Sequence, residues 1–301
     1  MLTLERVSKT YKVGMFGGKE LIAVNDVSFQ VRPGEVVSLI GESGSGKSTI
    51  GRMILRLTAV TEGAISFDDI DVSTLKRGEM KRYYRRVQGV FQDPFSSYNP
   101  IFKADRVFAM IRQAFFPHFA KSEWEDWLEE ALKAVGLNPG DVLGKYPHQL
   151  SGGQLQRLLV ARALLLDIEL LVADEIISML DASTRIDVLN LLGDLKARGL
   201  GILFITHDLS LGNYISDATI ILRRGRIVEM GATKKVFGNP KHPYTQMLLA
   251  SIPQLHTKWA AQATWREAPH DSVGPNGGSP ALVEVEQDHF VTPFDDRGED
   301  R

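Results

Sequence analysis

Residues 41–49 read Gly-Glu-Ser-Gly-Ser-Gly-Lys-Ser-Thr, which fits the phosphate-binding pattern G-x-x-x-x-G-K-[ST]. In such a loop, glycines such as Gly44 and Gly46 let the backbone bend so that its N–H groups converge on phosphate oxygens. Lys47 can then reach the β- and γ-phosphates of a nucleotide, and the Ser48 hydroxyl can hold Mg²⁺. By itself, this stretch predicts a nucleoside triphosphate site.

The sequence on both sides of the loop has the pattern that the motif requires. Residues 35–40 read as a buried strand, and residues 49–57 read as a helix whose N-terminal end faces the anion. A second motif, Leu-Ser-Gly-Gly-Gln, stands about 100 residues later at 150–154, just before a helical stretch at 155–166. Its serine and glycines offer a hydroxyl and backbone N–H groups at a helix N-terminus, which is a second anion site. Two phosphate sites for one nucleotide suggest that two chains enclose ATP between them.

With both motifs, the sequence resembles the ATP-binding cassette ATPases over about residues 1–255. The resemblance implies an α/β fold, a P-loop nucleotide-binding domain with a RecA-like core, a β-rich subdomain and a helical insertion. We expect the ATPase domain at 1–235, with its helical part at about 95–160. A C-terminal extension of the oligopeptide-transporter type, partly loosely ordered, is expected at 236–301.

The hydrophobic pattern agrees with this division. Alternating apolar residues predict strands near the N-terminus, and a hairpin is predicted at 219–230 around a turn at Arg224-Gly225. Within the helical part, Ser122 and Glu125 predict a capping box for a helix that ends at Gly136. The tryptophan at the start of that helix is expected to pack in the core.

Two carboxylates end an apolar strand at Leu170-Leu-Val-Ala-Asp-Glu175. The resemblance implies that Asp174 holds Mg²⁺ and that Glu175 is the general base that polarises the attacking water. Two carboxylates at the end of a strand can also simply begin a loop, but their spacing to both phosphate motifs favours the catalytic roles. The family has proline directly after this glutamate, whereas Ile176 stands here, and we expect it to leave the path to Asp181 freer.

The resemblance implies roles for four further residues. His207, after the strand 201–206, resembles the switch histidine that contacts the γ-phosphate, although a lone histidine is often structural. Gln92 resembles the hinge glutamine that reaches Mg²⁺ and water, although Gln-Asp-Pro is also an ordinary turn. Asp181 resembles a residue of the loop that touches the opposite protomer. Tyr11 resembles the aromatic that stacks on adenine, with a packing role as the alternative.

The expected site is therefore a set of short segments. Catalysis is assigned to Lys47, Gln92, Glu175 and His207, and Mg²⁺ to Ser48, Gln92 and Asp174. Nucleotide contacts are assigned to Tyr11, Gly41, Ser43, Gly44, Gly46, Lys47, Ser48, Thr49, Ser151, Gly152, Gly153, Gln154 and Asp181. The cofactors are ATP and Mg²⁺.

Composition narrows the class of protein. The 301 residues carry a formal net charge of −2, so charge gives no indication of nucleic-acid binding. The chain has no cysteine, which excludes disulfides and sites for zinc or iron–sulfur clusters that need cysteine. We find no apolar run long enough to span a bilayer and no signal peptide. Any membrane role must therefore come through a partner, and the resemblance implies a peripheral protein at the cytoplasmic face of the cell membrane.

Several segments resemble the ATPases of dipeptide and oligopeptide importers. They are Phe91 to Pro100, Met179 to Ser183, Ile205 to Leu209, His242 to Leu249 and, in the extension, Leu282 to Val291. Within the first of them, Phe95 and Tyr98 are aromatics of the exposed type between two prolines, so we expect the surface from Gln92 to Pro100 to receive a short permease helix, with a plain connecting loop as the alternative. The resemblance implies import of peptides, powered together with two permease subunits, a second related ATPase and an extracellular substrate-binding protein, and no nucleic acid. Import of oligosaccharides is the alternative, because members of the same branch carry them and the ATPase does not touch the cargo. The extension often holds cysteines for an iron–sulfur cluster, and their absence here weakens the preference for peptides.

Two other classes fit less well. Soluble cassette ATPases of DNA repair or translation have paired cassettes, zinc cysteines or long coiled coils, which this chain lacks. A nucleotide-binding subunit without catalysis would lack one or more of the reactive groups, and all are present here.

Overall fold

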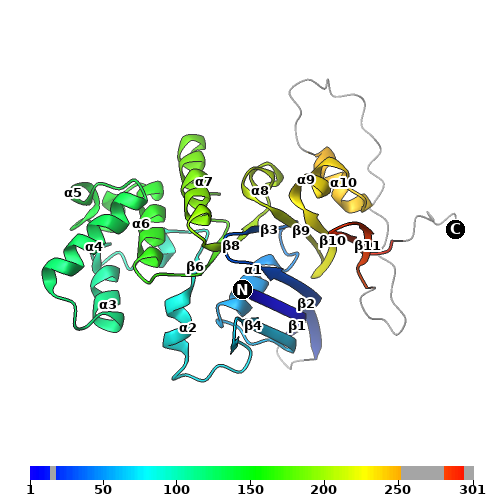
Figure 1. Ribbon diagram of the computed structural model, residues 1–301, viewed down its shortest axis with the longest axis horizontal. Coiled ribbons are helices and arrows are strands. Elements are labelled where there is room, and N and C mark those ends of the chain that lie inside the picture. The colour runs from blue at the N-terminus through cyan, green and yellow to red at the C-terminus, as the bar shows by residue number, and fades with distance from the viewer. Residues whose placement is uncertain (14–17, 252–280, 295–301) are drawn as a thin grey trace. The chain divides into compact units, whose positions relative to one another are not determined.

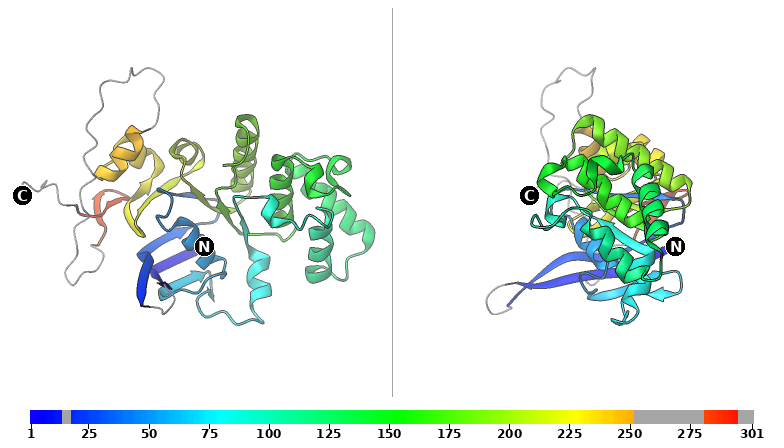
Figure 2. Two further views of the ribbon diagram at one scale, coloured as in Figure 1. Left: turned by 180° about the vertical axis from the view of Figure 1, so that it is seen from behind. Right: turned by 90° about the vertical axis from the view of Figure 1, so that its left-hand side faces the viewer.

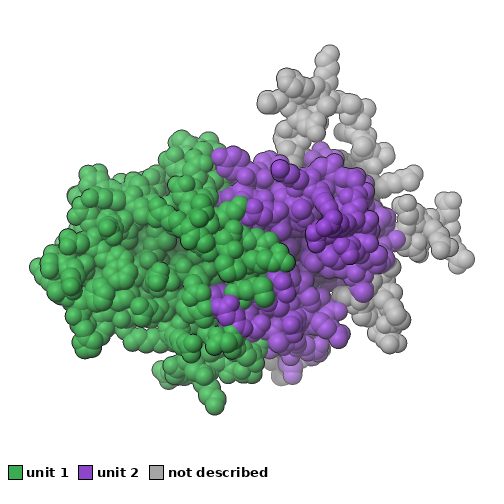
Figure 3. All heavy atoms as spheres, viewed as in Figure 1, with its two compact units in different colours: residues 1, 31–35, 69–203 green, residues 2–30, 36–68, 204–301 purple. Residues whose placement is uncertain are grey.

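The computed structural model describes residues 1–13, 18–251 and 281–294 (Figure 1). The chain divides into two compact units, coloured separately in Figure 3. The first unit consists of residues 1, 31–35 and 69–203. The second unit consists of residues 2–30, 36–68 and 204–301, apart from those outside the described ranges.

The second unit begins with an antiparallel sheet. It contains strands β1 (Leu2–Val13), β2 (Lys19–Val31) and β4 (Glu62–Phe67), in the order β2-β1-β4. Strand β1 pairs with β4 from Leu2 opposite Phe67 to Ser8 opposite Glu62. Alternate residues of β1, such as Leu4, are buried, as period-two patterning requires. The β-rich N-terminal region expected from the sequence is therefore present.

A second set of strands in this unit supports the phosphate loop. It contains β3 (Val36–Ile40), β9 (Ala218–Arg223), β10 (Arg226–Ala232), β11 (Val283–Glu286) and β12 (His289–Val291). Strand β3 is buried at every position and runs parallel to β9. The predicted hairpin is confirmed, because β9 and β10 pair antiparallel, and β12 adds to β10 on the other side.

Helices cover one face of these strands. In Figure 1, α8 (Leu209–Ile215), α9 (Thr233–Gly238) and α10 (Pro243–Ala250) lie above them, and the N-terminal sheet lies below. Helix α1 (Lys47–Ile54) follows the phosphate loop. Buried apolar side chains join the helices to the strands in one cluster, made up of Ile40, Leu209, Ile221, Val228, Val236 and Tyr244. The cluster includes Ile40, the last residue of β3, which directly precedes the phosphate loop.

The first unit contains a pair of parallel strands and a group of helices. Strands β6 (Val87–Val90) and β7 (Leu170–Asp174) pair in parallel, and β7 is the apolar strand that the sequence predicts before the two carboxylates. Just before each strand, Arg86 and Glu169 form a two-point ion pair, with Nη2 and Oε2 2.7 Å apart. Strand β8 (Gly201–Thr206) begins in this unit and ends in the second.

The helices of the first unit mostly gather in one group, visible in both views of Figure 2. They are α2 (Met80–Arg86), α3 (Arg106–Phe115), α4 (Lys121–Ala134), α5 (Pro139–Val142), α6 (Gly152–Leu164) and α7 (Ala182–Ala197). The unit also has a two-residue strand, β5 (Ile70–Asp71), and 3₁₀ turns at Phe95–Ser97 and Pro147–Gln149. Helices α3 to α6 lie within or close to the range 95–160 expected for the helical part.

The start of helix α4 corrects one expectation. The predicted capping box of Ser122 and Glu125 is wrong, because the helix already begins at Lys121. The cap is made instead by the Glu123 carboxylate, which accepts the N–H of Ala120 at 3.0 Å. The predicted end is confirmed, since Gly136 follows the helix at a φ of 67°.

Candidate nucleotide-binding site

The predicted site residues divide between the two units. The second unit contains Tyr11, the phosphate loop at 41–49 and His207. The first unit contains the remaining residues, which are Gln92, Ser151, Gly152, Gly153, Gln154, Asp174, Glu175 and Asp181. Each unit thus supplies part of the chemistry that the sequence predicts.

The phosphate loop has a shape that only glycine permits. Gly46 caps helix α1 at a φ of 105°, and a Cβ added there would lie 2.4 Å from the carbonyl oxygen of Ala23. Gly41 is equally enclosed, because its added Cβ would lie 2.1 Å from the oxygen of Leu222. Gly44 has a φ of 80° but open space around it. The first two glycines are therefore required by neighbouring backbone, and Gly44 by its own conformation.

Lys47 is the first residue of helix α1 and is almost completely buried. Its ammonium group donates to the carbonyl oxygens of Gly41 and Glu42, both at 2.8 Å, and lies 3.5 Å from the Ser45 hydroxyl. A buried ammonium needs such partners, since desolvation of an unpaired charge is costly. These contacts hold the charge inside the curve of the loop, where the motif places phosphate.

The turn between β9 and β10 holds the loop from outside. The N–H of Gly225 donates to the Ser45 carbonyl at 2.9 Å, and its own carbonyl accepts the N–H of Asn25 at 2.8 Å. Gly225 has a φ of 82°, and an added Cβ would lie 2.8 Å from the oxygen of Ala23. Sequence reasoning identified this turn but missed its contact with the loop. The dipeptide Arg224-Gly225 indicates a turn, but it does not indicate which part of the chain the turn contacts, because Ser45 is distant in the sequence.

The two other predicted residues of this unit lie on different elements. His207 is exposed and directly follows β8, and the next residue, Asp208, caps helix α8 by accepting the N–H of Ser210 at 2.9 Å. Tyr11 lies on β1 and is half-buried, with the Lys9 ammonium 5.0 Å from its ring centroid. Its stacking role stays a prediction.

In the first unit, the two carboxylates occupy the end of β7. Asp174 is the last residue of the strand and is buried, whereas Glu175 is half-buried. Glu175 has a φ of 51°, a left-handed conformation that is uncommon for residues other than glycine. Such strained conformations concentrate at functional sites, because the surrounding structure must hold them.

The segment after Glu175 is more constrained than we expected from Ile176. The Ile176 side chain is buried, and the Glu175 carbonyl accepts both the N–H of Ser178, at 3.1 Å, and its hydroxyl, at 2.9 Å. Arg185 of helix α7 donates to the carbonyl of Leu180 at 2.8 Å. Burial and hydrogen bonds therefore fix the path to Asp181 without proline.

The second motif forms the start of helix α6. Ser151 and Gln154 make a reciprocal capping box, with Ser151 Oγ accepting the Gln154 N–H at 3.1 Å and Gln154 Oε1 accepting the Ser151 N–H at 2.9 Å. Gly152 and Gly153 are the first helical residues, whose N–H groups find no partner within a helix. A Cβ on Gly153 would lie 2.7 Å from the Thr184 methyl group of helix α7.

Asp181 caps helix α7. Its carboxylate accepts the Thr184 N–H and the Thr184 hydroxyl, both at 2.9 Å, and the Ser183 hydroxyl at 2.6 Å. The hydrogen bond from Ser183, followed by those from Thr184, lowers the pKa of Asp181 well below its usual range. The side chain therefore stays an anion, and its oxygens are occupied by its own helix.

Gln92 is exposed just after β6 and begins a turn that is fixed by Asp93. Tyr98 differs from expectation: its side chain is half-buried, and its hydroxyl donates to the Leu155 carbonyl at 3.4 Å. Burial raises the pKa of Tyr98. The exposed apolar side chains near Gln92 are instead Phe95, Ile101, which is 76% exposed, and Phe102.

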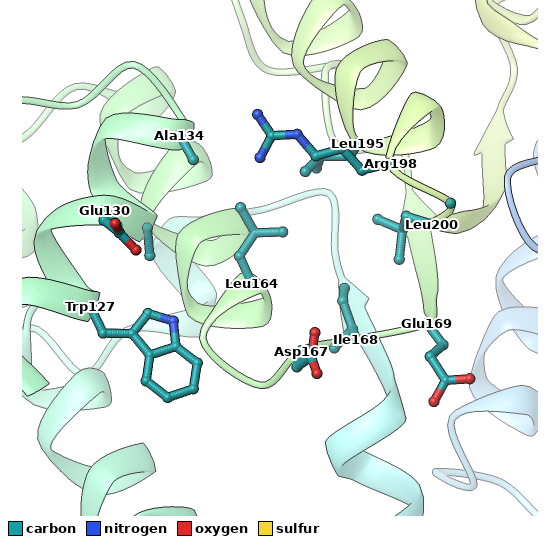
Figure 4. Close-up of a pocket in the computed structure, with 12 residues that line it drawn as sticks. Trp127, Glu130, Ala134, Leu164, Asp167, Ile168, Glu169, Leu195, Arg198 and Leu200 are labelled. Carbon is teal, nitrogen blue, oxygen red and sulfur yellow. The ribbon is translucent and has the colours of Figure 1, made fainter. Parts of the chain in front are cut away.

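A separate pocket of about 460 Å³ lies in the first unit (Figure 4). Trp127 and Glu130 line it from helix α4, Arg198 from just after α7, and Glu169 from just before β7. No predicted site residue lines it, so we do not assign it to the nucleotide.

Comparison with known proteins identifies the family. A model of ABC transporters matches residues 24–178, and a model of the C-terminal region of oligopeptide/dipeptide transporters matches residues 228–278. A Brucella ovis protein named for peptide import ATP binding is 44% identical over 254 residues, which are 84% of this chain and 78% of that protein. The chain belongs to the ABC transporter family of ATPases. The fold expected from the sequence, an ABC nucleotide-binding domain, is therefore confirmed.

Two further relatives of this ABC ATPase are named for oligopeptide transport. AppF of Bacillus subtilis is 41% identical over 261 residues, covering 84% of this chain and 78% of AppF. OppF of Streptococcus pyogenes serotype M1 is 38% identical over 280 residues, covering 91% of this chain and 90% of OppF.

Solved structures agree with the family. A dimeric ATP-binding cassette in a post-hydrolysis state, bound to ADP and Pi, has a TM-score of 0.70 and 30% identity, and covers 77% of this chain and 99% of that one. Within the described parts of this ABC ATPase, we find no helix both long and apolar enough to cross a bilayer.

Proposed function

We propose that this ABC ATPase hydrolyses ATP to drive the import of di- or oligopeptides. The observation that carries the proposal is the enclosed phosphate loop, in which the Lys47 ammonium is held by the carbonyls of Gly41 and Glu42. The match of residues 228–278 to the C-terminal region of oligopeptide/dipeptide transporters supports peptides as the cargo. The relatives named above are also named for peptides, so we prefer peptides to oligosaccharides.

Hydrolysis would proceed by in-line attack of water, without a covalent enzyme intermediate. Loop N–H groups and Lys47 would bind the phosphates, and Glu175 would orient the water and accept its proton. His207 and Gln92 would help to position that water, and Tyr11 would stack on adenine. Most of the rate enhancement would come from fixed charges and dipoles around the transferred phosphoryl group.

The residues proposed for Mg²⁺ suit that ion chemically. Ser48, Gln92 and Asp174 offer a hydroxyl, an amide oxygen and a carboxylate, and Mg²⁺ prefers oxygen ligands. One or two carboxylates with substrate phosphates and waters are usual for Mg²⁺, so Asp174 as a single carboxylate is sufficient. When bound, the ion neutralises charge on the β- and γ-phosphates.

The motif at 151–154 would act on ATP bound to a second ATPase subunit. This proposal is supported by the N-terminal position of Gly152 and Gly153 in helix α6 and by two phosphate motifs for one nucleotide. Asp181 would belong to the same interface. A related but different ATPase is our preferred second subunit.

Two permease subunits and an extracellular substrate-binding protein would complete the transporter. The ATPase would lie peripherally at the cytoplasmic face of the membrane. We define the docking surface as Phe95, Ile101 and Phe102, because these apolar side chains are exposed in the segment that follows Gln92. A short amphipathic helix of the permease would bind there. We keep 1–235 as the ATPase domain, with its helical part at about 95–160, and 236–301 as the extension.

The cargo is tested by uptake assays in a strain that lacks the gene. Loss of di- or oligopeptide uptake, restored by the intact chain and not by a Lys47→Ala variant, is expected. Normal peptide uptake combined with failure to grow on a short oligosaccharide would support the alternative cargo.

A further inference from the structure

The segment His-Pro-Tyr-Thr at 242–245 has no role in the function proposed above. It forms the start of helix α10, where His242 caps the helix and its Nδ1 accepts the N–H of Tyr244 at 3.1 Å. The ring of Tyr244 is 1% exposed and packs in the buried cluster that includes Ile40 at the end of strand β3. This helix therefore places one tyrosine next to the start of the phosphate loop.

Tyr244 contacts the phosphate loop through its hydroxyl group. The hydroxyl oxygen accepts the N–H of Glu42 at 3.4 Å. Glu42 is the same residue whose carbonyl accepts the Lys47 ammonium at 2.8 Å. The guanidinium of Arg223, at the end of β9, lies over the Tyr244 ring, 5.0 Å from its centroid. Tyr244 thus fixes the peptide that positions Lys47.

A buried carboxylate connects this helix to the C-terminal strands. Glu229 of β10 has no exposed surface, and its Oε2 accepts the N–H of His242 at 3.0 Å. Its Oε1 accepts the N–H of Lys241 at 2.8 Å and lies 2.7 Å from Nε2 of His289 on β12. A buried carboxylate needs several hydrogen bonds, so loss of His289 weakens the set that holds helix α10.

We propose that Tyr244 is a positioning residue for the phosphate loop and that the C-terminal hairpin, β11 and β12, supports it through Glu229. The hydrogen-bonded path lies within the second unit and runs through His289, Glu229, His242, Tyr244, Glu42 and Lys47. The inference rests on the proposed function, because it assigns the loop to ATP. Its consequence is that a segment outside the site sets the affinity for ATP.

The first test separates this role from ordinary core packing. Tyr244→Phe keeps the buried ring and removes only the hydroxyl that accepts from Glu42. Loss of one neutral hydrogen bond predicts ATP binding that is about twofold to tenfold weaker, with a KM that rises and a kcat that stays within about twofold. Tyr83→Phe is the matched control, because Tyr83 is a fully buried tyrosine of helix α2 in the first unit, and its change should leave the Kd for ATP unaltered.

The second test addresses the C-terminal hairpin in the full chain. His289→Ala should increase hydrogen exchange at residues 42–47 as well as 289–292 and should weaken ATP binding, whereas His289→Gln can still donate to Glu229 and should restore most of both. If the parent binds ATP and Tyr244→Phe binds it equally well, the positioning role is wrong. If His289→Ala frees the hairpin but leaves loop exchange and Kd unchanged, the link to the hairpin is wrong. A parent that does not bind ATP would instead refute the proposed function.

Discussion

At the scale of single residues, Glu175 combines a proposed catalytic role with an unfavourable backbone conformation. Its φ of 51° is held by the buried Ile176 that follows and by the hydrogen bonds of Ser178 to its carbonyl. When the backbone of a residue is held in this way, the direction in which its side chain leaves the backbone is fixed. This is useful for a base that must point at one water molecule.

We expect Glu175→Gln to lower ATP hydrolysis by about 10²- to 10⁴-fold, because the amide cannot accept the proton from water. ATP binding should be retained, and gel filtration with ATP should show the variant trapped with its partner subunit. Glu130→Gln on helix α4 is a suitable control, since that exposed side chain lies outside the proposed site. Hydrolysis by Glu175→Gln at the parental rate would assign the base elsewhere.

Residue types and spacing were sufficient to predict which residues could bind phosphate, but not which contacts hold them. The motif at 41–49 identifies Lys47, yet the roles of Gly225 and Tyr244 depend on hydrogen bonds to residues more than 170 positions away in the sequence. Tyr98 was predicted to be exposed as an aromatic in a stretch flanked by Pro94 and Pro100. Its burial against helix α6 follows from tertiary packing, which local sequence does not encode.

At the scale of elements, helix α7 begins at a carboxylate whose charge matters for stability. Hydrogen bonds from Ser183 and Thr184 lower the pKa of Asp181 in the folded chain. A lowered folded pKa means that the stabilising contribution is complete above the unfolded value, about 3.9, and is lost as the pH falls further.

We therefore expect the stability of the parent to fall more steeply below about pH 4 than that of Asp181→Asn, which keeps a capping oxygen but cannot titrate. Urea unfolding at a series of pH values measures the difference. Identical pH profiles for the two proteins would show that this cap does not contribute to acid sensitivity.

The same helix offers a comparison between two glycines with open space around their Cα atoms. Gly193 lies inside helix α7, and Gly199 follows the helix with a φ of 98°. Gly193→Ala should stabilise the protein by about 0.5–1 kcal/mol, because alanine loses less backbone entropy in a helix. Gly199→Ala should destabilise it by about 1–2 kcal/mol, since alanine is strained at that φ. Equal effects in urea unfolding would contradict this explanation.

Elements were predicted better than their ends. Strand β8 and the hairpin of β9 and β10 were predicted almost to the residue, because apolar runs and a glycine turn define them. Helix α4 starts earlier than predicted because Glu123, rather than Ser122, supplies the capping oxygen. Several polar residues in a row permit more than one cap, so the pattern alone could not choose.

At the scale of the whole molecule, the docking surface connects the ATPase to transport. We expect the double variant Phe95→Ser, Ile101→Ser to reduce peptide uptake by about tenfold, because buried apolar anchors at interfaces commonly contribute that much. Basal ATPase activity should change by less than about twofold. Leu57→Ser is the control, since Leu57 is an equally exposed apolar residue of the second unit. Undiminished uptake by the double variant would place the docking site elsewhere.

The family could be predicted from the sequence, since two motifs at the right spacing are sufficient for it. The preference for peptides came from the segments at 91–100 and 242–249, and the match of residues 228–278 now supports it. The expected looseness of the extension falls largely on residues 252–280, outside the described residues. The last part of the extension, at 282–291, is ordered, because β12 pairs with β10 through backbone hydrogen bonds.

The exposure of Ile101 has a practical consequence for a chain without native thiols. A cysteine introduced at this position would be the only sulfhydryl group in the protein and would be open to solvent. A fluorophore or spin label attached there would report the arrival of the permease in real time. The same position would accept a cross-linker of chosen length, so the docking helix could be identified by mass spectrometry of the joined peptides.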